Sequence, residues 1–190
     1  MAVLTGLLSS AVLAGAVLVL SATVASSERA AHRSEVSAKG RLLFLNTSNH
    51  CHAFRDLVAF AASKANAPGP LLEQLKLVLI GTGLRERGKG SDYIGNTPGA
   101  RGDTGFRDDL RDGSPQVEHA MAAIYIGKLY PPGSTEAVAL RTEIMGPLTG
   151  RGELNTADVL LYTIGGDIGQ RLSGSNFKEL PRVIERTICK

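Results

Sequence analysis

The chain has 190 residues, of which 43% are hydrophobic and only 5% aromatic, with no tryptophan. Its 21 basic and 18 acidic residues give a net charge of +3 and are mixed along the chain. A weak, evenly mixed charge without a basic stripe excludes an ordinary nucleic-acid-binding surface.

The N-terminal segment is the first element of the chain, and residues 2–25 carry no charged side chain. A run of this length enters a bilayer or a translocon. Three interpretations are open: a signal peptide cleaved after Ala25, a retained membrane anchor, and an ordinary buried helix. The first two predict a secreted or membrane-anchored, extracytoplasmic protein, which contacts the membrane through residues 2–25 if they are not cleaved.

The remainder of the chain is predicted to be a short linker and one domain. Residues 26–40 are polar, rich in Ala and Ser and without apolar periodicity, which predicts a linker before a domain over 41–190. A domain of about 150 residues can bury a core of Leu, Ile, Val and Ala. The chain's two cysteines, Cys51 and Cys189, bracket this domain. We expect a disulfide between them, with two unrelated buried thiols as the alternative.

Two helices are predicted at the start of the domain. The first begins after Asn49 and stops before Pro68. Its apolar residues at helical spacing are Phe54, Leu57, Val58 and Ala61. Pro70 suits the first turn of a second helix, from Leu71 to about Leu84. Because the run from Leu75 to Ile80 is short and apolar, a strand is the alternative there.

Residues 85–113 form a predicted Gly/Asp/Arg-rich loop, with seven glycines, six basic and six acidic residues. A loop this long inside a compact domain is usually functional or disordered. The spacing from Gly83 to Gly90 resembles a phosphate-binding loop, but Gly90 stands where a magnesium-binding hydroxyl is needed. The aspartates fit no standard calcium loop. No cofactor and no metal are therefore predicted.

Four more helices are predicted after the loop, and the second of these is short. Ser114 and Pro115 open a third helix, which is apolar on nearly every face from Val117 to Ile126 and is therefore expected to be buried. A short helix follows Ser134. Asn155 and Asp158 form a capping-box-like start of a fifth helix. Its core stripe comprises Ala157, Leu161, Ile164, Ile168 and Leu172, and a final helix runs from about Pro181 to Cys189.

Small residues on the third and fifth helices predict that the two helices pack closely. Gly165 and Gly169 lie four residues apart and leave a groove on the fifth helix. Gly127, Ala120 and Ala123 on the third helix are the expected partners. The predicted fold is mainly α, a compact bundle of five or six helices with these two helices at its centre, preceded by the N-terminal apolar helix.

His119 is the most informative single residue for function. It lies in the first turn of the buried third helix, directly after the polar loop, and a buried imidazole needs a hydrogen-bond partner. The nearest acceptors in sequence belong to the loop. The candidate catalytic residues are therefore His119, Asp103, Arg107 and Asp108, which together predict a hydrolase-like acid–base site. A structural histidine bonded to the backbone is the alternative.

Two further interpretations remain open. In an extended segment, His50 and His52 would share one face and chelate a metal, but no third ligand is near, so no metal site is predicted. A Cys51–His119 nucleophilic pair is incompatible with the disulfide. For the whole domain, the alternative to an enzyme is a non-catalytic extracellular binding or structural module.

Overall fold

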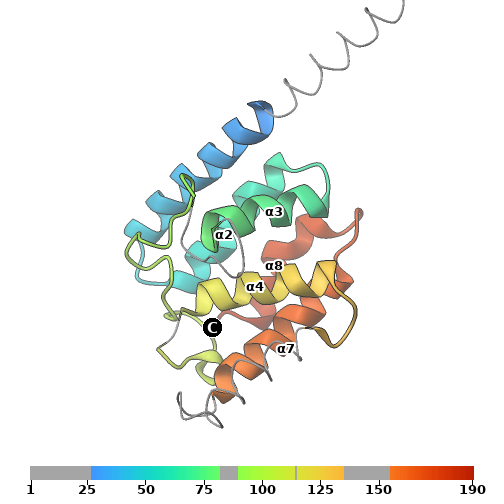
Figure 1. Cartoon of the computed structure of the whole chain (residues 1–190). Helices are drawn as coiled ribbons and strands as arrows, with labels where there is room; N and C mark the ends of the chain where they lie inside the picture. Colours follow the sequence, from blue (N-terminus) through green and yellow to red (C-terminus); the bar gives the residue numbers. More distant parts are fainter. Residues whose placement is uncertain (1–26, 82–89, 114, 135–154) are drawn as a thin grey trace, which may run out of the picture. The chain divides into compact units, whose positions relative to one another are not determined.

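The computed structural model describes residues 27–81, 90–113, 115–134 and 155–190 (Figure 1). The chain divides into two compact units, residues 1–35 and 36–190. In the first unit, residues 27–35 are helical. The second unit carries every other described element. Within the described ranges all regular elements are helices, so the prediction of a mainly α protein is confirmed.

The predicted N-terminal apolar segment lies outside the described residues. Among the residues that are described, no helix is both long enough and apolar enough to cross a membrane.

The second unit begins earlier than predicted, because residues 36–45 are helical where part of a linker was expected. Val36 and Phe44, eight residues apart, are buried. Between them Gly40 lies so close to the core that a Cβ atom would come within 2.6 Å of Ile94 Cδ1. The linker prediction for 26–40 failed because this helix buries a narrow stripe that contains glycine, which apolar periodicity does not detect.

Helices α2 (His50–Lys64) and α3 (Pro68–Leu79) confirm the first two predicted helices. The Asn49 side chain caps α2 by accepting a hydrogen bond from the His52 amide at 3.0 Å. The run from Leu75 to Leu79 is helical, so the strand alternative is wrong. The predicted end near Leu84 is also wrong, because Gly81 adopts a positive φ of 103° and leaves the helix.

Residues 90–113 are irregular apart from a short 3-10 helix, η1 (Asp108–Leu110). Hydrophobic side chains at five positions are buried along this segment: Tyr93, Ile94, Ala100, Phe106 and Leu110. Backbone bonds fix its two ends, from Ile94 N to Val78 O at 2.9 Å and from Arg107 N to Ile188 O at 3.0 Å. Apolar anchors without a regular period therefore hold this polar segment against the rest of the unit.

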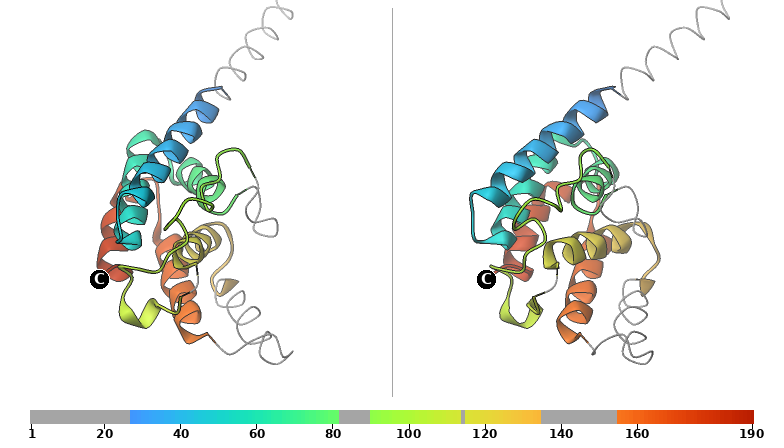
Figure 2. Two further views of the ribbon diagram at one scale, coloured as in Figure 1. Left: turned by 90° about the vertical axis from the view of Figure 1, so that its left-hand side faces the viewer. Right: turned by 60° about the vertical axis from the view of Figure 1, so that its left-hand side comes forward.

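Helix α4 (Gln116–Leu129) is buried on nearly every face, as predicted, and α7 (Thr156–Arg171) packs along it. They lie side by side in Figure 1 and remain adjacent in both views of Figure 2. The Asn155 side chain caps α7 by accepting from the Asp158 amide at 3.1 Å. The predicted cap Ser114 and the body of the short helix after Ser134 lie outside the described residues.

The contact between α4 and α7 depends on glycine, which confirms the predicted close packing. A Cβ atom on Gly165 would lie 2.5 Å from Ala123 Cβ. A Cβ atom on Gly169 would lie 2.2 Å from the Ile124 carbonyl oxygen, and one on Gly127 would lie 2.3 Å from Gly166 O. The two backbones therefore approach so closely that no side chain fits between them.

The chain then turns through η3 (Phe177–Glu179) into α8 (Leu180–Thr187), close to the predicted final helix. Helix α8 packs against α2. Next to this contact Cys51 and Cys189 form a disulfide with a Cα–Cα distance of 5.6 Å across 138 positions of sequence. The predicted bridge is confirmed, and it excludes the Cys51–His119 pair.

Candidate functional site

The His119 side chain meets Asp158 where the first turns of α4 and α7 come together. The His119 Nδ1 atom lies 2.8 Å from Asp158 Oδ1. The side chains are 12% and 4% exposed, respectively. This places a nearly buried carboxylate against one ring nitrogen of a histidine that still reaches the surface.

The surroundings of Asp158 define the proton positions. The Asn155 side-chain amide donates to Asp158 Oδ2 at 3.1 Å, while Oδ1 faces the imidazole. An ionised carboxylate can only accept hydrogen bonds, so a His119 ring paired with ionised Asp158 donates from Nδ1. In the neutral ring the lone pair then lies on Nε2, for which no bond to a described residue is found.

Neighbouring side chains restrict the movement of the His119 ring. The Tyr162 ring lies 5.8 Å from it between centroids, at 41°, and Tyr162 is buried one turn after Asp158 on α7. At the start of α4, the buried Gln116 side chain donates to the Leu110 carbonyl at 2.6 Å. Asn155 also donates to Asp112. Residues 110 and 112 of the polar loop thus support the site from the side.

The other predicted site residues are not joined to His119 within the described residues. The Asp103 carboxylate lies 3.6 Å from Arg111 Nε and accepts from the Gly113 amide at 3.3 Å. Arg107 pairs with Asp109 and donates from Nη1 to the Thr187 carbonyl at 2.9 Å. These contacts direct both side chains to other parts of the loop and to α8.

Asp108 is likewise engaged elsewhere, with Lys190. The Lys190 Nζ atom lies 2.8 Å from Asp108 Oδ2. This hydrogen bond and the charge of Lys190, together with Arg111, lower the pKa of the Asp108 carboxyl from its ordinary value. Asp108 therefore stays ionised at neutral pH on the exposed side of η1.

Glu118 is a second buried acidic residue beside the site, which the sequence analysis did not single out. It is 1% exposed, and its Oε2 lies 3.1 Å from Nε of Arg101, a half-exposed residue of the polar loop. A negative charge in the first turn of a helix is favoured by the helix dipole. Glu118 therefore fastens the loop to the start of α4, next to His119.

Asp158 is the side-chain partner of His119 that the sequence analysis missed, although it noted the residue as a helix cap. The predicted contacts contained a signal for it. Ala123 lies against Gly165, and Gly127 lies against Gly169. The two helices are therefore parallel, and residues in contact are separated by the same number of positions along the chain. Applied to His119, the same separation in sequence places it beside the turn of α7 between Asp158 and Tyr162.

The His50–Cys51–His52 cluster is not extended, so it lacks the geometry in which the two histidines would share one face. These residues begin a helix, so the two histidines point apart. His50 Nδ1 bonds Thr104 Oγ1 at 2.8 Å, and His52 Nε2 lies 3.4 Å from Glu185. Among the described residues, no group of three or more His, Cys, Asp or Glu side chains is arranged to hold a metal ion.

The polar loop closes directly over the His50 ring. A Cβ atom on Gly102 would lie 1.9 Å from His50 Nδ1, and one on Gly99, which has a positive φ of 80°, would lie 2.5 Å from Nε2. Burial lowers the pKa of His50 from its ordinary value of 6.5, although the nearby Asp103 charge opposes this shift. The loop therefore covers the His50 ring closely, and this burial favours the neutral form of the imidazole.

The free energy of unfolding should consequently fall as the pH is lowered from neutral to about 5. Below pH 6.5 the unfolded chain binds a proton at His50 before the folded protein does, because the folded pKa is the lower one. The check is urea unfolding across this range for wild type and His50→Gln. The wild type should lose more stability with acid than the variant, and equal slopes would contradict the assignment.

A polar cluster ties α3 to α4 on the other side of the unit. The Tyr125 hydroxyl donates to Glu73 at 2.7 Å, and Lys76 Nζ lies 2.9 Å from the same carboxylate. Burial would raise the pKa of Glu73, but these two hydrogen bonds outweigh it and lower the value. Burial, together with the bond to Glu73, raises the pKa of Tyr125. We interpret this cluster as a structural bridge.

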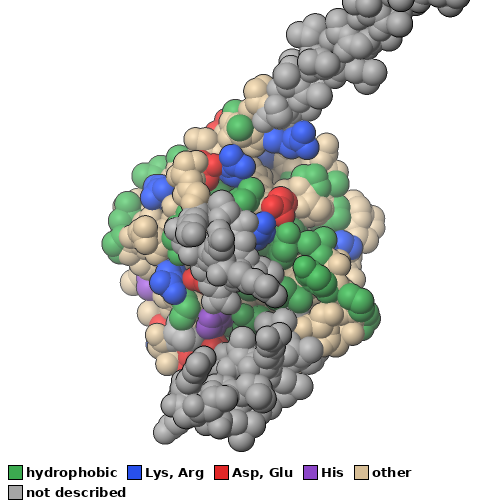
Figure 3. Space-filling model, in the orientation of Figure 1, with side chains coloured by type: hydrophobic (Ala, Val, Ile, Leu, Met, Phe, Trp, Pro, Cys, Tyr) green, Lys and Arg blue, Asp and Glu red, His purple; other side chains and the backbone are tan. Residues whose placement is uncertain are grey.

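Figure 3 shows hydrophobic side chains gathered over the end of α4. Leu129 and Tyr130 are each about half exposed there, at 52% and 53%. They follow directly on the buried centre of α4, so this patch is where the apolar helix emerges at the surface.

Comparisons with protein-family models, with curated proteins and with solved structures find no match to this chain.

Proposed function

We propose that the protein is a secreted or membrane-anchored, hydrolase-like enzyme in which His119, oriented by Asp158, acts as a general base. The observation that carries this proposal is the 2.8 Å bond from His119 Nδ1 to Asp158 Oδ1. A carboxylate at this position fixes the ring tautomer and stabilises the positive charge that the ring acquires when Nε2 accepts a proton.

The chemistry follows from these proton positions. Nε2 takes a proton from a water molecule or a hydroxyl group as its oxygen attacks the substrate. The imidazolium so formed is stabilised by Asp158, and it then returns the proton to the leaving group. Proton transfer of this kind contributes typically about 10²–10⁴-fold to a rate.

The polar loop has a supporting role in this proposal. Asp112 and Leu110 hold Asn155 and Gln116 through hydrogen bonds. Asn155 in turn positions Asp158. Asp103, Arg107 and Asp108 stay outside the proposed site because their side chains are engaged with other residues.

An extracytoplasmic location is part of the proposal. The disulfide between Cys51 and Cys189 is compatible with it, because such bonds persist in oxidising compartments. The uncharged run of residues 2–25 supplies either the export signal or the anchor.

The second candidate is a non-catalytic extracellular binding or structural module. It is favoured by the position of the same hydrogen bond, since a bond between the first turns of α4 and α7 also fastens two helices. In this case His119 contributes stability and no chemistry.

The test compares wild type with His119→Gln and Asp158→Asn against a panel of ester, amide, phosphodiester and glycoside substrates. The enzyme proposal predicts turnover by wild type and a loss of about 10²–10⁴-fold in His119→Gln, because glutamine cannot accept the proton. Asp158→Asn should also lose activity, since an amide no longer stabilises the imidazolium.

His52→Gln is the matched control, because it removes another partly buried histidine that lies away from Asp158. Its activity should stay near that of wild type. If wild type turns over no substrate of the panel, or if His119→Gln loses stability but keeps activity, the enzyme proposal fails and the binding-module proposal stands.

A further inference from the structure

A groove lies between α7 and the η3–α8 segment, apart from the His119 site. Its volume is about 590 Å³, within the range of about 300–1,000 Å³ typical of small-molecule sites. Apolar side chains line its floor: Ile164, Ile168 and Leu172 from α7 and its end, and Leu180 and Val183 from α8. An apolar floor of this size favours a ligand with an aliphatic part.

Charged side chains surround the apolar floor, and most of them have partners. Arg171 Nη2 lies 3.7 Å from Asp167, and Arg182 Nη1 lies 4.0 Å from Glu179. Arg107, at the end of the groove near Thr187, uses its Nε and Nη2 atoms on Asp109. In each pair the acidic side chain neutralises the charge of the arginine.

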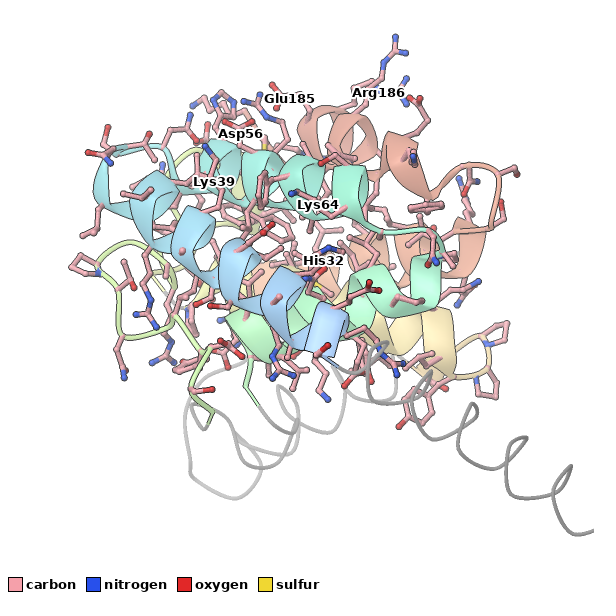
Figure 4. The ribbon with its side chains drawn as sticks, turned by 90° about the horizontal axis from the view of Figure 1, so that it is seen from above. His32, Lys39, Asp56, Lys64, Glu185 and Arg186 are labelled. Carbon is pink, nitrogen blue, oxygen red and sulfur yellow. A yellow bond between two sulfur atoms is a disulfide. The ribbon has the colours of Figure 1, made fainter. Side chains whose placement is uncertain are left out.

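Arg186 is different. It lines the groove and is exposed, and no hydrogen bond or ion pair joins it to any described residue. It lies one helical turn after Val183, on the same face of α8. Figure 4 shows Arg186 projecting from the outer side of α8. Among the described residues that line the groove, Arg186 therefore supplies a positive charge without a partner at the edge of the apolar floor.

We propose that this groove binds a single-chain amphiphile with a carboxylate head, of the fatty-acid type. The aliphatic chain lies on Ile164, Ile168 and Val183, and the guanidinium of Arg186 binds the head. A guanidinium matches a carboxylate through two parallel hydrogen bonds. The single positive charge of Arg186 favours a ligand with one negative charge. The apolar floor favours a ligand with an aliphatic chain over a small inorganic anion.

The test is calorimetric titration of the full-length protein with laurate, below the concentration at which laurate forms micelles. Wild type should bind one laurate per chain. Arg186→Gln should bind about tenfold more weakly, because it loses a charge-assisted hydrogen bond. Dodecanol, which has the same chain without the charge, should bind wild type about as weakly as laurate binds the variant.

Arg182→Gln is the matched control, because Arg182 is an arginine of the same helix that does not line the groove. It should bind laurate with nearly the wild-type affinity. Val183→Glu adds a like charge beside the head and should abolish binding while α-helical content, measured by circular dichroism, stays unchanged.

Several results would overturn the proposal: no saturable binding by wild type, many laurates per chain as with a detergent, or equal affinities of Arg186→Gln and Arg182→Gln. Binding of the protein to vesicles of anionic lipid without binding of free laurate would also overturn it, in favour of a membrane-contact surface. None of these outcomes bears on His119, whose role is tested by turnover.

Discussion

Removing the disulfide by the double substitution Cys51→Ser and Cys189→Ser is expected to lower the free energy of unfolding by about 4–5 kcal/mol. The bond closes a loop across 138 positions of sequence, which is nearly the whole second unit. Such a long loop removes much conformational entropy from the unfolded chain. Both cysteines are also buried, so each serine hydroxyl adds a cost of its own.

The measurement is urea unfolding of the oxidised wild type, the reduced wild type and the double variant. The reduced wild type isolates the effect of the cross-link, because it keeps both sulfur atoms in place. It should lose most of the stability that the variant loses. A difference below about 1 kcal/mol between oxidised and reduced protein would show that the bond contributes little.

The substitution Gly169→Ala is expected to destabilise the protein by about 3 kcal/mol. The added Cβ would lie 2.2 Å from the Ile124 carbonyl oxygen and 2.7 Å from the Lys128 amide nitrogen. Both atoms belong to the α4 backbone, which cannot move aside as a flexible side chain can. The two central helices would therefore have to separate along their contact.

Gly69→Ala provides the control, because Gly69 also lies in a helix but has no atom within 4 Å of its ideal Cβ position. The change in stability should be small, because the higher helix propensity of alanine is opposed by Pro70, which disfavours the helical conformation of the residue before it. Thermal unfolding of both variants checks the pair. Similar shifts in Tm for the two would show that α4 and α7 are not held by backbone contact.

The elements that the sequence predicts well are those with local signals. Helix α2 follows from an Asn49 cap and apolar residues at helical spacing, and α7 follows from the Asn155 cap. The buried position of α4 follows from its apolar composition on every face. Caps and composition depend on neighbouring residues alone, so they can be recognised without the fold.

The elements that the sequence misses depend on distant contacts. The helical residues 36–45 are stabilised by a narrow stripe at Val36, Gly40 and Phe44, which meets residues such as Ile94 far along the chain. The end of α3 is decided by Gly81, whose positive φ leaves the helix before the predicted end near Leu84. For residues 36–45 the local pattern is therefore weaker than the tertiary contact.

The candidate site shows the same division. The position of His119 at the start of a buried helix can be predicted, because burial and the polar loop before it are visible in sequence. Its partner Asp158 lies 39 positions away and arrives only through the packing of α7 on α4. Proximity in sequence to Asp103 and Asp108 was therefore a poor guide to proximity in space.

The disulfide has a consequence for the order in which the chain can mature. A chain delivered from its N-terminal side presents α2 long before α8, its packing partner. Until α8 arrives, Cys51 has no cysteine to pair with, and the part of α2 that packs against α8 stays uncovered. Formation of the bond therefore requires the segment that follows α8, so a chain truncated before Cys189 cannot form it.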